Sequence, residues 1–305
     1  MAKRIFQKDN LKWVYINQPT QEDLDYLKNA FDFHPLISES IVNPTLHPAF
    51  EEYKDHLFLI LHFPVIFREK VANLALEVDF IFTKNTVVTI TYQPYKRLEE
   101  FFDKIADDTE TQKRFQNHQS GKLVYGIIDS LLSNLINDVD FLELEITRIE
   151  DEIFEMPSHQ IVEDISHARR DILDFRRIIT ATQPVLEILP QAAVKFYGDD
   201  MDPYFTDLVT TEHRIRHLVE NHKETIEALN ATHESLLSSR TSSVIGVLTV
   251  FSAILLPLNL IASLWGTNYE YLPLSHHPYG FWILAGAMVF IAIGLVAIFR
   301  YKRWL

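Results

Sequence analysis

Cysteine is absent from the 305 residues, which excludes disulfide bonds, thiolate metal ligands and cysteine nucleophiles together. Positive charge is scarce: the chain has 28 Lys and Arg residues and 42 Asp and Glu residues, which gives a formal net charge of -14. Such a surface repels polyanions and attracts small cations, so we expect no nucleic-acid partner. The chain also lacks a Gly-x-x-x-x-Gly-Lys loop and a His-Glu-x-x-His pair. We therefore expect no nucleotide site and no enzyme activity.

Charge of either sign is missing from two long stretches near the end of the chain. The first, 242–265, has about 24 residues and would span about 36 Å as a helix, enough to cross a bilayer core. The second, 281–299, has about 19 residues, close to the minimum length. Both stretches predict transmembrane helices, and the alternative is a buried helical hairpin of a soluble protein.

The basic residues that flank these two stretches predict their orientation. Arg240 precedes the first, and Arg300, Lys302 and Arg303 follow the second, whereas the connection at 266–280 has no lysine or arginine. The positive-inside rule then places both termini in the cytoplasm. The first ten residues, MAKRIFQKDN, contain no apolar core of signal-peptide length, which agrees with a cytoplasmic N-terminus. We expect a two-pass protein of the cell (inner or plasma) membrane, in contact with lipid.

The remainder divides by its hydrophobic pattern. In 1–118, the β-rich runs KWVYIN, LFLILHF, ALEVDFIF and TVVTITY alternate with the helical segments QEDLDYLKNAF and HPLISESI, which predicts an α/β domain. In 119–203, apolar residues recur at spacings of three and four, which predicts long antiparallel cytosolic helices. One helix should end near Pro190 and bend at Pro184.

The third helical stretch continues into the membrane. No glycine or proline occurs between Pro203 and Gly246, and the apolar rhythm leads directly into the first uncharged run. We therefore expect one rod over 204–265, about 62 residues or about 93 Å long. A rod with a single apolar stripe is poorly stable alone, so it should bundle with neighbours or with copies of itself.

The polar break after the first membrane run reads PLNLIASLWGTN, and the chain ends in the basic YKRWL. Together with the order of the parts, these stretches resemble the CorA family of divalent-cation transporters over essentially the whole chain. The family signature is Gly-Met-Asn at the end of the first membrane helix, followed by an aromatic residue, an acid and a proline. The matching residues here are Gly266, Asn268, Tyr269, Glu270 and Pro273, whereas Thr267 occupies the methionine position.

This resemblance implies a fold and a function. The fold would be an α/β cytosolic domain, a long helical stalk and two C-terminal transmembrane helices, assembled as a funnel-shaped homopentamer. The function would be influx of Mg²⁺, with Co²⁺ and Ni²⁺ as further substrates, driven by membrane potential and gated by cytosolic divalent ions. The selectivity filter would be Gly266, Thr267 and Asn268, with Glu270 as the loop acid.

The residues of the predicted filter have the chemistry to bind a hydrated divalent cation. Mg²⁺ releases water reluctantly, so a ring of neutral oxygens can hold it through its hydration shell. An asparagine amide and main-chain carbonyls at a helix end supply such oxygens. The alternative is that glycine and asparagine only terminate the helix.

The resemblance also implies a pore lining of Asn259, Leu256, Leu248, Ile245 and Ser242. Asn259 would form a polar ring, and the leucines and isoleucine an apolar constriction that gates by dewetting. The alternative is ordinary packing against a neighbouring helix. In the family, divalent ions that bridge carboxylates hold the pore shut; the matching acid is Asp207, and Glu69 is the candidate for its partner.

Two other functions stay open. Thr267 in place of methionine, together with His276 and His277, keeps a Zn²⁺ transporter of the ZntB type in view. His213 and His217 lie one helical turn apart, a spacing at which two histidines can bind a transition metal. The alternative is that both are ordinary surface residues. The second function that stays open is a membrane-anchored sensor without a pore. An anchor, however, needs neither a mid-membrane asparagine nor a Gly-x-Asn sequence at the end of the membrane helix.

Overall fold

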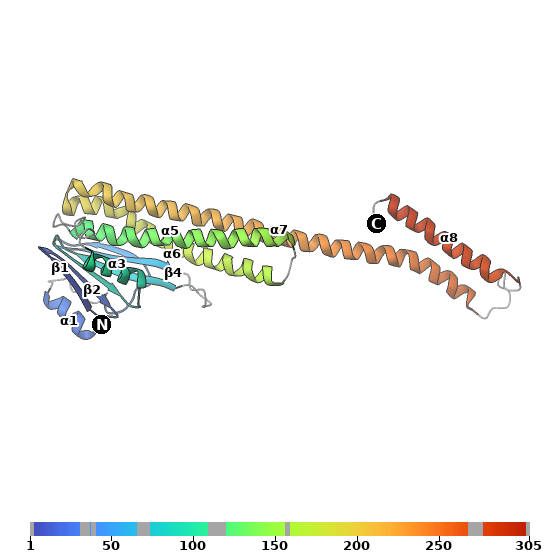
Figure 1. Ribbon diagram of the computed structural model, residues 1–305, viewed down its shortest axis with the longest axis horizontal. Helices are drawn as coiled ribbons and strands as arrows, with labels where there is room; N and C mark the ends of the chain where they lie inside the picture. The colour runs from blue at the N-terminus through green and yellow to red at the C-terminus, as the bar shows by residue number, and fades with distance from the viewer. Residues whose placement is uncertain are drawn as a thin grey trace. The chain divides into compact units, whose positions relative to one another are not determined.

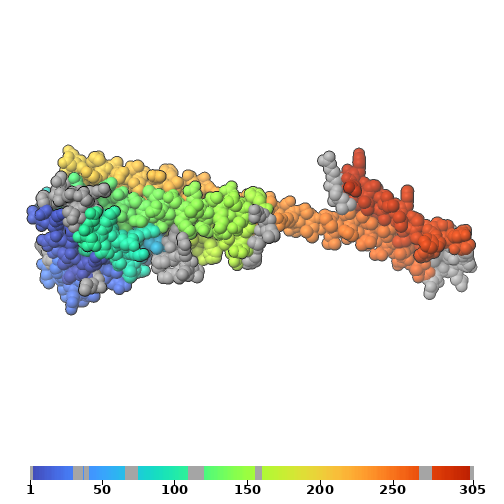
Figure 2. All heavy atoms as spheres, viewed as in Figure 1, coloured from blue at the N-terminus to red at the C-terminus, as the bar shows by residue number. Residues whose placement is uncertain are grey.

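The computed structural model describes residues 3–30, 37, 41–65, 74–108, 120–155, 159–267 and 277–302. The chain forms two compact units, Met1–Asn230 and Ala231–Leu305. The boundary between them falls inside helix α7 (Asp202–Trp265), which contributes to both. Figures 1 and 2 show the elements of each unit along the chain.

A six-stranded sheet forms the base of the first unit, in the order β1-β2-β6-β5-β4-β3. Strands β2 and β6 pair in parallel, and the other neighbours are antiparallel. The strands are β1 (Lys3–Lys8), β2 (Leu11–Asn17), β3 (Ala49–Glu52), β4 (Leu57–Val65), β5 (Leu74–Phe82) and β6 (Thr86–Thr91). The central strands are apolar on both faces, as expected for a sheet that is covered on both sides.

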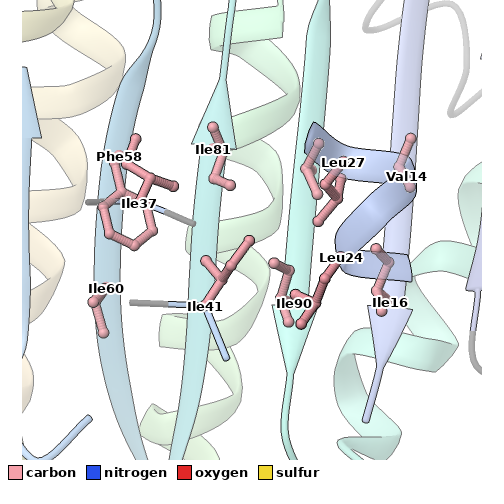
Figure 3. Close-up of a cluster of buried hydrophobic side chains, with 11 residues drawn as sticks. Val14, Ile16, Leu24, Leu27, Ile37, Ile41, Phe58, Ile60, Ile81 and Ile90 are labelled. Carbon is pink, nitrogen blue, oxygen red and sulfur yellow. The ribbon is translucent and has the colours of Figure 1, made fainter. Parts of the chain in front are cut away.

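Helix α1 (Gln21–Ala30) packs on one face of this sheet. It begins at a capping box, because the Asp23 carboxylate accepts the Thr20 N–H at 3.1 Å and the Asp23 N–H points to the Thr20 hydroxyl at 3.3 Å. Its buried Leu24 and Leu27 pack in one hydrophobic cluster with side chains of β2 and β6, and this cluster also includes Ile37 (Figure 3). The strand residues are Val14, Ile16, Val88 and Ile90. The hydrophobic effect of this cluster holds α1 against the strands.

The opposite face carries the longer helices. Trp13 of β2 packs on Phe102 of α3 (Lys96–Asp107) with ring centroids 4.7 Å apart. Helix α5 (Ser120–Glu155) lies over β4, β5 and β6, and α6 (His159–Tyr197) over β4. The Thr182 hydroxyl of α6 donates to the His62 carbonyl at 3.2 Å. The first unit is thus a helix–sheet–helix sandwich from which long helices extend (Figure 1).

The second unit contains the C-terminal half of α7 and helix α8 (Gly280–Tyr301). Both helices are long and apolar enough to cross a membrane, with mean hydropathy of 2.4 and 2.6 in their most apolar windows. Most of their large apolar side chains are exposed. An α/β domain, a long helical stalk and two apolar C-terminal helices confirm the predicted fold class.

Several elements differ from the sequence-based expectation. Strands β1 and β3 and helix α3 were not predicted. Both strands lie at the edges of the sheet, where charged residues replace the apolar alternation that marks a central strand. Helix α6 continues through Pro184 and Pro190 to Tyr197, because its buried apolar face outweighs the lost hydrogen bonds. Of the predicted segment HPLISESI, only Ile37 and Ile41 are among the described residues.

The start of α5 requires a glycine, which gives a stability prediction. A Cβ at Gly121 would lie 3.0 Å from the Tyr197 ring and 3.1 Å from the Met201 methyl group. We expect Gly121→Ala to destabilise the first unit by about 1–3 kcal/mol, the usual cost of overpacking. Thermal unfolding of the detergent-solubilised chain by circular dichroism measures the change.

Ser133→Ala, at an exposed position of the same helix, is the matched control and should stay within about 0.5 kcal/mol of the parent. Equal midpoints for the two variants would show that the contact between α5 and the end of α6 is loose.

Candidate functional site

The predicted pore-lining residues share one side of α7. At 100° per residue, Ser242, Ile245, Leu248, Leu256 and Asn259 fall within an arc of about 120°. All five are exposed, and Leu256 and Leu248 keep 68% and 65% of their surface. The buried Val250 lies outside this arc. Apolar side chains outside this arc are exposed as well, among them Val247 and Phe251. This part of α7 is therefore available to lipid or to further copies of the helix.

The end of α7 is shaped by Gly266 and Thr267. The Gly266 N–H donates to the Ala262 carbonyl at 2.9 Å, and a Cβ at Gly266 would lie 3.2 Å from that oxygen. The Thr267 hydroxyl donates to the Leu264 carbonyl at 2.7 Å, and the Thr267 N–H lies 3.4 Å from the same oxygen. The threonine side chain thus caps a carbonyl that the helix end leaves open, a contact that methionine cannot make.

Four predicted residues lie outside the described part of the chain. They are Asn268 and Glu270 of the signature, Glu69 and His276. The roles assigned to them stay predictions.

Asp207 contacts the start of α5. Its carboxylate accepts a hydrogen bond from the Tyr125 hydroxyl at 2.9 Å, and the Tyr125 ring meets the Tyr204 ring edge-on at 5.2 Å. Asp129 lies one turn beyond Tyr125 on the same helix. Burial raises the pKa of the Asp129 carboxyl, and the charge of Asp207 raises it further. The fold therefore places two acids, 78 positions apart in sequence, within electrostatic reach of each other.

A groove of about 670 Å³ adjoins this pair. Its walls carry acidic, basic and aromatic side chains, among them Glu100, Lys104, Lys122, Asp129 and Tyr204. The Lys122 ammonium lies 5.5 Å from the centre of the Tyr204 ring. Among the described residues, no three His, Asp or Glu side chains come together in a way that holds a metal ion.

Asp129 was missed in the sequence. It sits in the run LVYGIIDSLLSNL, where it is an isolated acid on a mostly apolar helix. That isolation among apolar residues is a signal that the residue has a partner. The identity of the partner depends on how α5 packs against α7, which hydrophobic periodicity does not give.

The histidine pair of the stalk is divided between two environments. The His213 imidazole lies 3.1 Å from the Glu187 carboxylate of α6, whereas His217 is exposed. Hydrogen bonds from Gln183 and His213 lower the pKa of Glu187. In the described structure His213 is therefore the partner of a carboxylate on another helix, and no third metal ligand joins it and His217.

Known proteins share this architecture. The cobalt/magnesium transport protein CorA of Thermotoga maritima is 26% identical over 295 residues, which cover 96% of this chain and 83% of that protein. The solved CorA magnesium transporter of Methanocaldococcus jannaschii superposes with a TM-score of 0.85 at 22% identity, covering 98% of this chain and 93% of that one. The ZntB cytoplasmic domain of Vibrio parahaemolyticus gives a TM-score of 0.63 at 12% identity, over 76% of this chain and 90% of that domain.

The sequence profile described as CorA-like Mg²⁺ transporter protein matches residues 8–303. The match spans the α/β sandwich, the long helices, α7 with its Gly-Thr end, and α8. The chain belongs to the family of CorA-like Mg²⁺ transporter proteins.

Proposed function

We propose that the chain assembles as a homopentamer that conducts Mg²⁺ into the cytoplasm. The observation that carries the proposal is the polar Asn259, which lies on one side of a membrane-length helix together with apolar side chains. A lipid anchor has no use for a mid-membrane asparagine, since an unpaired polar side chain is costly in hydrocarbon. Around a shared axis the same residue becomes a ring of amide groups that a hydrated cation can cross.

The direction and the driving force follow from charge. The basic residues that flank the membrane helices favour cytoplasmic termini, so the Gly-Thr-Asn signature faces outside. Moving a divalent ion through 100 mV is worth about 4.6 kcal/mol, twice the value for a single charge. A negative interior therefore drives Mg²⁺ inward without ATP.

The filter is proposed to be Gly266, Thr267 and Asn268, with Glu270 as the acid that attracts cations to the entrance. Helix-end carbonyls and amide oxygens are neutral hard ligands, which suit an ion that keeps part of its hydration shell. Leu256, Leu248 and Ile245 form the apolar constriction that closes by dewetting. Co²⁺ and Ni²⁺ are the further substrates. The family membership does not favour a pore-free sensor or a Zn²⁺ transporter.

Regulation is proposed at the acidic pair of α5 and α7. Two carboxylates whose charges oppose each other gain stability from a cation between them. Burial raises the pKa of Asp129, and the charge of Asp207 raises it further. Among the described residues, Asp129 and Asp207 are the two acids that act on each other at this place. A neighbouring copy would complete the ligand set, with Glu69 as the candidate, and the bridging Mg²⁺ would hold subunits in the closed arrangement.

Asn268 gives the test of the filter. Asn268→Ala removes the amide oxygen, and Asn268→Asp replaces neutral ligands with a ring of negative charges. We expect both variants to lose selective Mg²⁺ uptake into proteoliposomes by more than about tenfold, the loss that follows from about 1.4 kcal/mol of binding. Asn137→Ala, at an exposed position of α5, is the control and should leave uptake unchanged. Parent-like uptake by Asn268→Ala would remove the residue from the filter.

Thr267 tests whether the helix cap influences ion choice. Thr267→Val keeps the shape of the side chain and removes the hydroxyl that donates to Leu264, whereas Thr267→Ser keeps the hydroxyl. We expect the serine variant to retain the parental ratio of Mg²⁺ to Zn²⁺ uptake. The valine and methionine variants should change this ratio, with methionine favouring Mg²⁺. The same ratio in all four proteins would leave Thr267 without a role in selectivity.

Asp207 tests the regulatory site. Asp207→Ala removes one of the two acids and leaves Tyr125 without its acceptor. We expect a higher Mg²⁺ concentration to be needed for half-inhibition of the current, with assembly intact by size-exclusion chromatography. Asp129→Ala should act in the same direction, and Glu224→Ala, exposed elsewhere on α7, should have no effect. An unchanged inhibition curve in both aspartate variants would exclude this pair from regulation.

A further inference from the structure

A second group of buried acids lies on the face of the sheet that α1 covers. His62 of β4 stands directly opposite Glu77 of β5 in the strand register, with 3.4 Å between the imidazole Nε2 and the carboxylate. Asp79 follows two positions later on the same face, and the Tyr92 hydroxyl donates to it at 2.7 Å. Only 6% of the surface of His62 and of Glu77 is exposed, and none of Asp79.

The segment 41–48 is attached to this cluster through Thr45. The Thr45 N–H donates to Glu77 Oε2 at 2.6 Å, and the Thr45 hydroxyl to Glu77 Oε1 at 3.2 Å. The Thr45 carbonyl lies 3.1 Å from His62 Nε2. Both main-chain polar groups of one residue are therefore satisfied by two side chains of the cluster. These contacts require a Glu77 carboxylate that accepts and a His62 Nε2 that donates.

The burial of Asp79 favours its protonated form. Burial raises the pKa of Asp79 well above the ordinary value, and the nearby Glu77 carboxylate raises it further, against a smaller opposing effect of the Tyr92 hydrogen bond. Its Oδ1 atom has no hydrogen-bond partner among the described residues, and neither does His62 Nδ1. An ionised Asp79 would place a second negative charge beside Glu77, and no Lys or Arg side chain of the described residues pairs with either acid.

Among the described residues of this face, the lysines have partners other than Glu77 and Asp79, and Lys3 pairs with Asp23 at 3.6 Å. Helix α1 contributes Leu24 and Leu27 to the core, with Tyr26 at its margin, where Lys12 donates to the Tyr26 hydroxyl at 2.9 Å. Tyr53 donates its own hydroxyl to Glu51. The groups that act on Asp79 are thus Glu77, Tyr92 and, through Glu77, His62.

Water can reach the cluster. A cavity of about 170 Å³ is lined by Thr45, His62, Glu77, Tyr92 and Gln93, among others. This volume is sufficient for water molecules, which can exchange protons with the Glu77 carboxyl group in its wall.

We propose that His62, Glu77, Asp79 and Tyr92 form a proton-binding site that fastens segment 41–48 to the sheet while Asp79 holds its proton. Release of that proton leaves two adjacent carboxylates, and their repulsion displaces Glu77 from Thr45. The site is independent of the Asp129 and Asp207 pair and of the proposed transport function.

The direction of the pH effect follows from the raised pKa. A group whose pKa is higher in the closed state stabilises that state fully below its ordinary value, about 3.9 for aspartate. The stabilisation is lost as pH rises through the raised value. Across this window the ratio of open to closed segment should increase about tenfold for each pH unit, the limit for one proton.

Hydrogen exchange measures this ratio directly, because the Thr45 N–H donates to Glu77. The full chain in detergent is exchanged between pH 5 and pH 8, and mass spectrometry follows a peptide that covers 41–48, corrected for intrinsic exchange. We expect protection to fall with pH in the parent protein and to stay constant in Asp79→Asn, which is neutral at every pH. Tyr92→Phe removes the hydrogen bond that lowers the pKa of Asp79, so the fall should extend to higher pH. Asp55→Asn, exposed in the turn between β3 and β4, should behave as the parent.

Two results would overturn the proposal. One is protection in the parent that does not change with pH, and the other is a parental pH slope in Asp79→Asn, which would show that Asp79 is not the group that titrates. If Asp79→Asn does not fold, Tyr92→Phe decides, since an unshifted pH range in that variant contradicts the role of Asp79.

Discussion

The hydrogen-bonded backbone of α7 is the constraint on which the rest of the structure depends. This helix has 64 residues, from Asp202 to Trp265, and a length of about 96 Å. A backbone that crosses hydrocarbon must satisfy its own polar groups, and a helix does so without any partner. Because the hydrogen bonds are internal, the side chains are free for other purposes. In the first part of α7 the side chains pack and form ion pairs, and in the last part most side chains are exposed.

The two ends of α7 then carry different chemistry. Near its start, Asp207 accepts the Tyr125 hydroxyl and faces a second acid across the helix interface. At its end, Gly266 allows the chain to approach a carbonyl closely, and the Thr267 hydroxyl covers another. An ion bound between subunits at the first place would act on the same helix that ends at the filter. This shared element is the physical basis for regulation in the proposed mechanism.

Local patterns predicted much of the fold, and long-range packing explains what they missed. The uncharged runs at 242–265 and 281–299 predicted two membrane-length helices, because their length and composition suit a bilayer core. The central strands β2, β4, β5 and β6 were visible as β-rich runs, whereas β1 and β3 lie at edges where composition is mixed. Thr267 was recognised in the sequence as a departure from the family signature, but the hydrogen bond from its hydroxyl to the Leu264 carbonyl is visible only in the structure. Asp129 and the cluster around Asp79 escaped notice because an acid in a sequence does not reveal which strand or helix it will face.

The most direct test of the central claim is uptake by proteoliposomes under an imposed membrane potential, with no ATP present. The purified full chain is reconstituted, and entry of Mg²⁺, Co²⁺, Ni²⁺ and Zn²⁺ is followed with and without a negative interior. The account predicts Mg²⁺ entry that increases with the potential and exceeds entry of Zn²⁺. Uptake that ignores the potential, or that requires ATP, would contradict it.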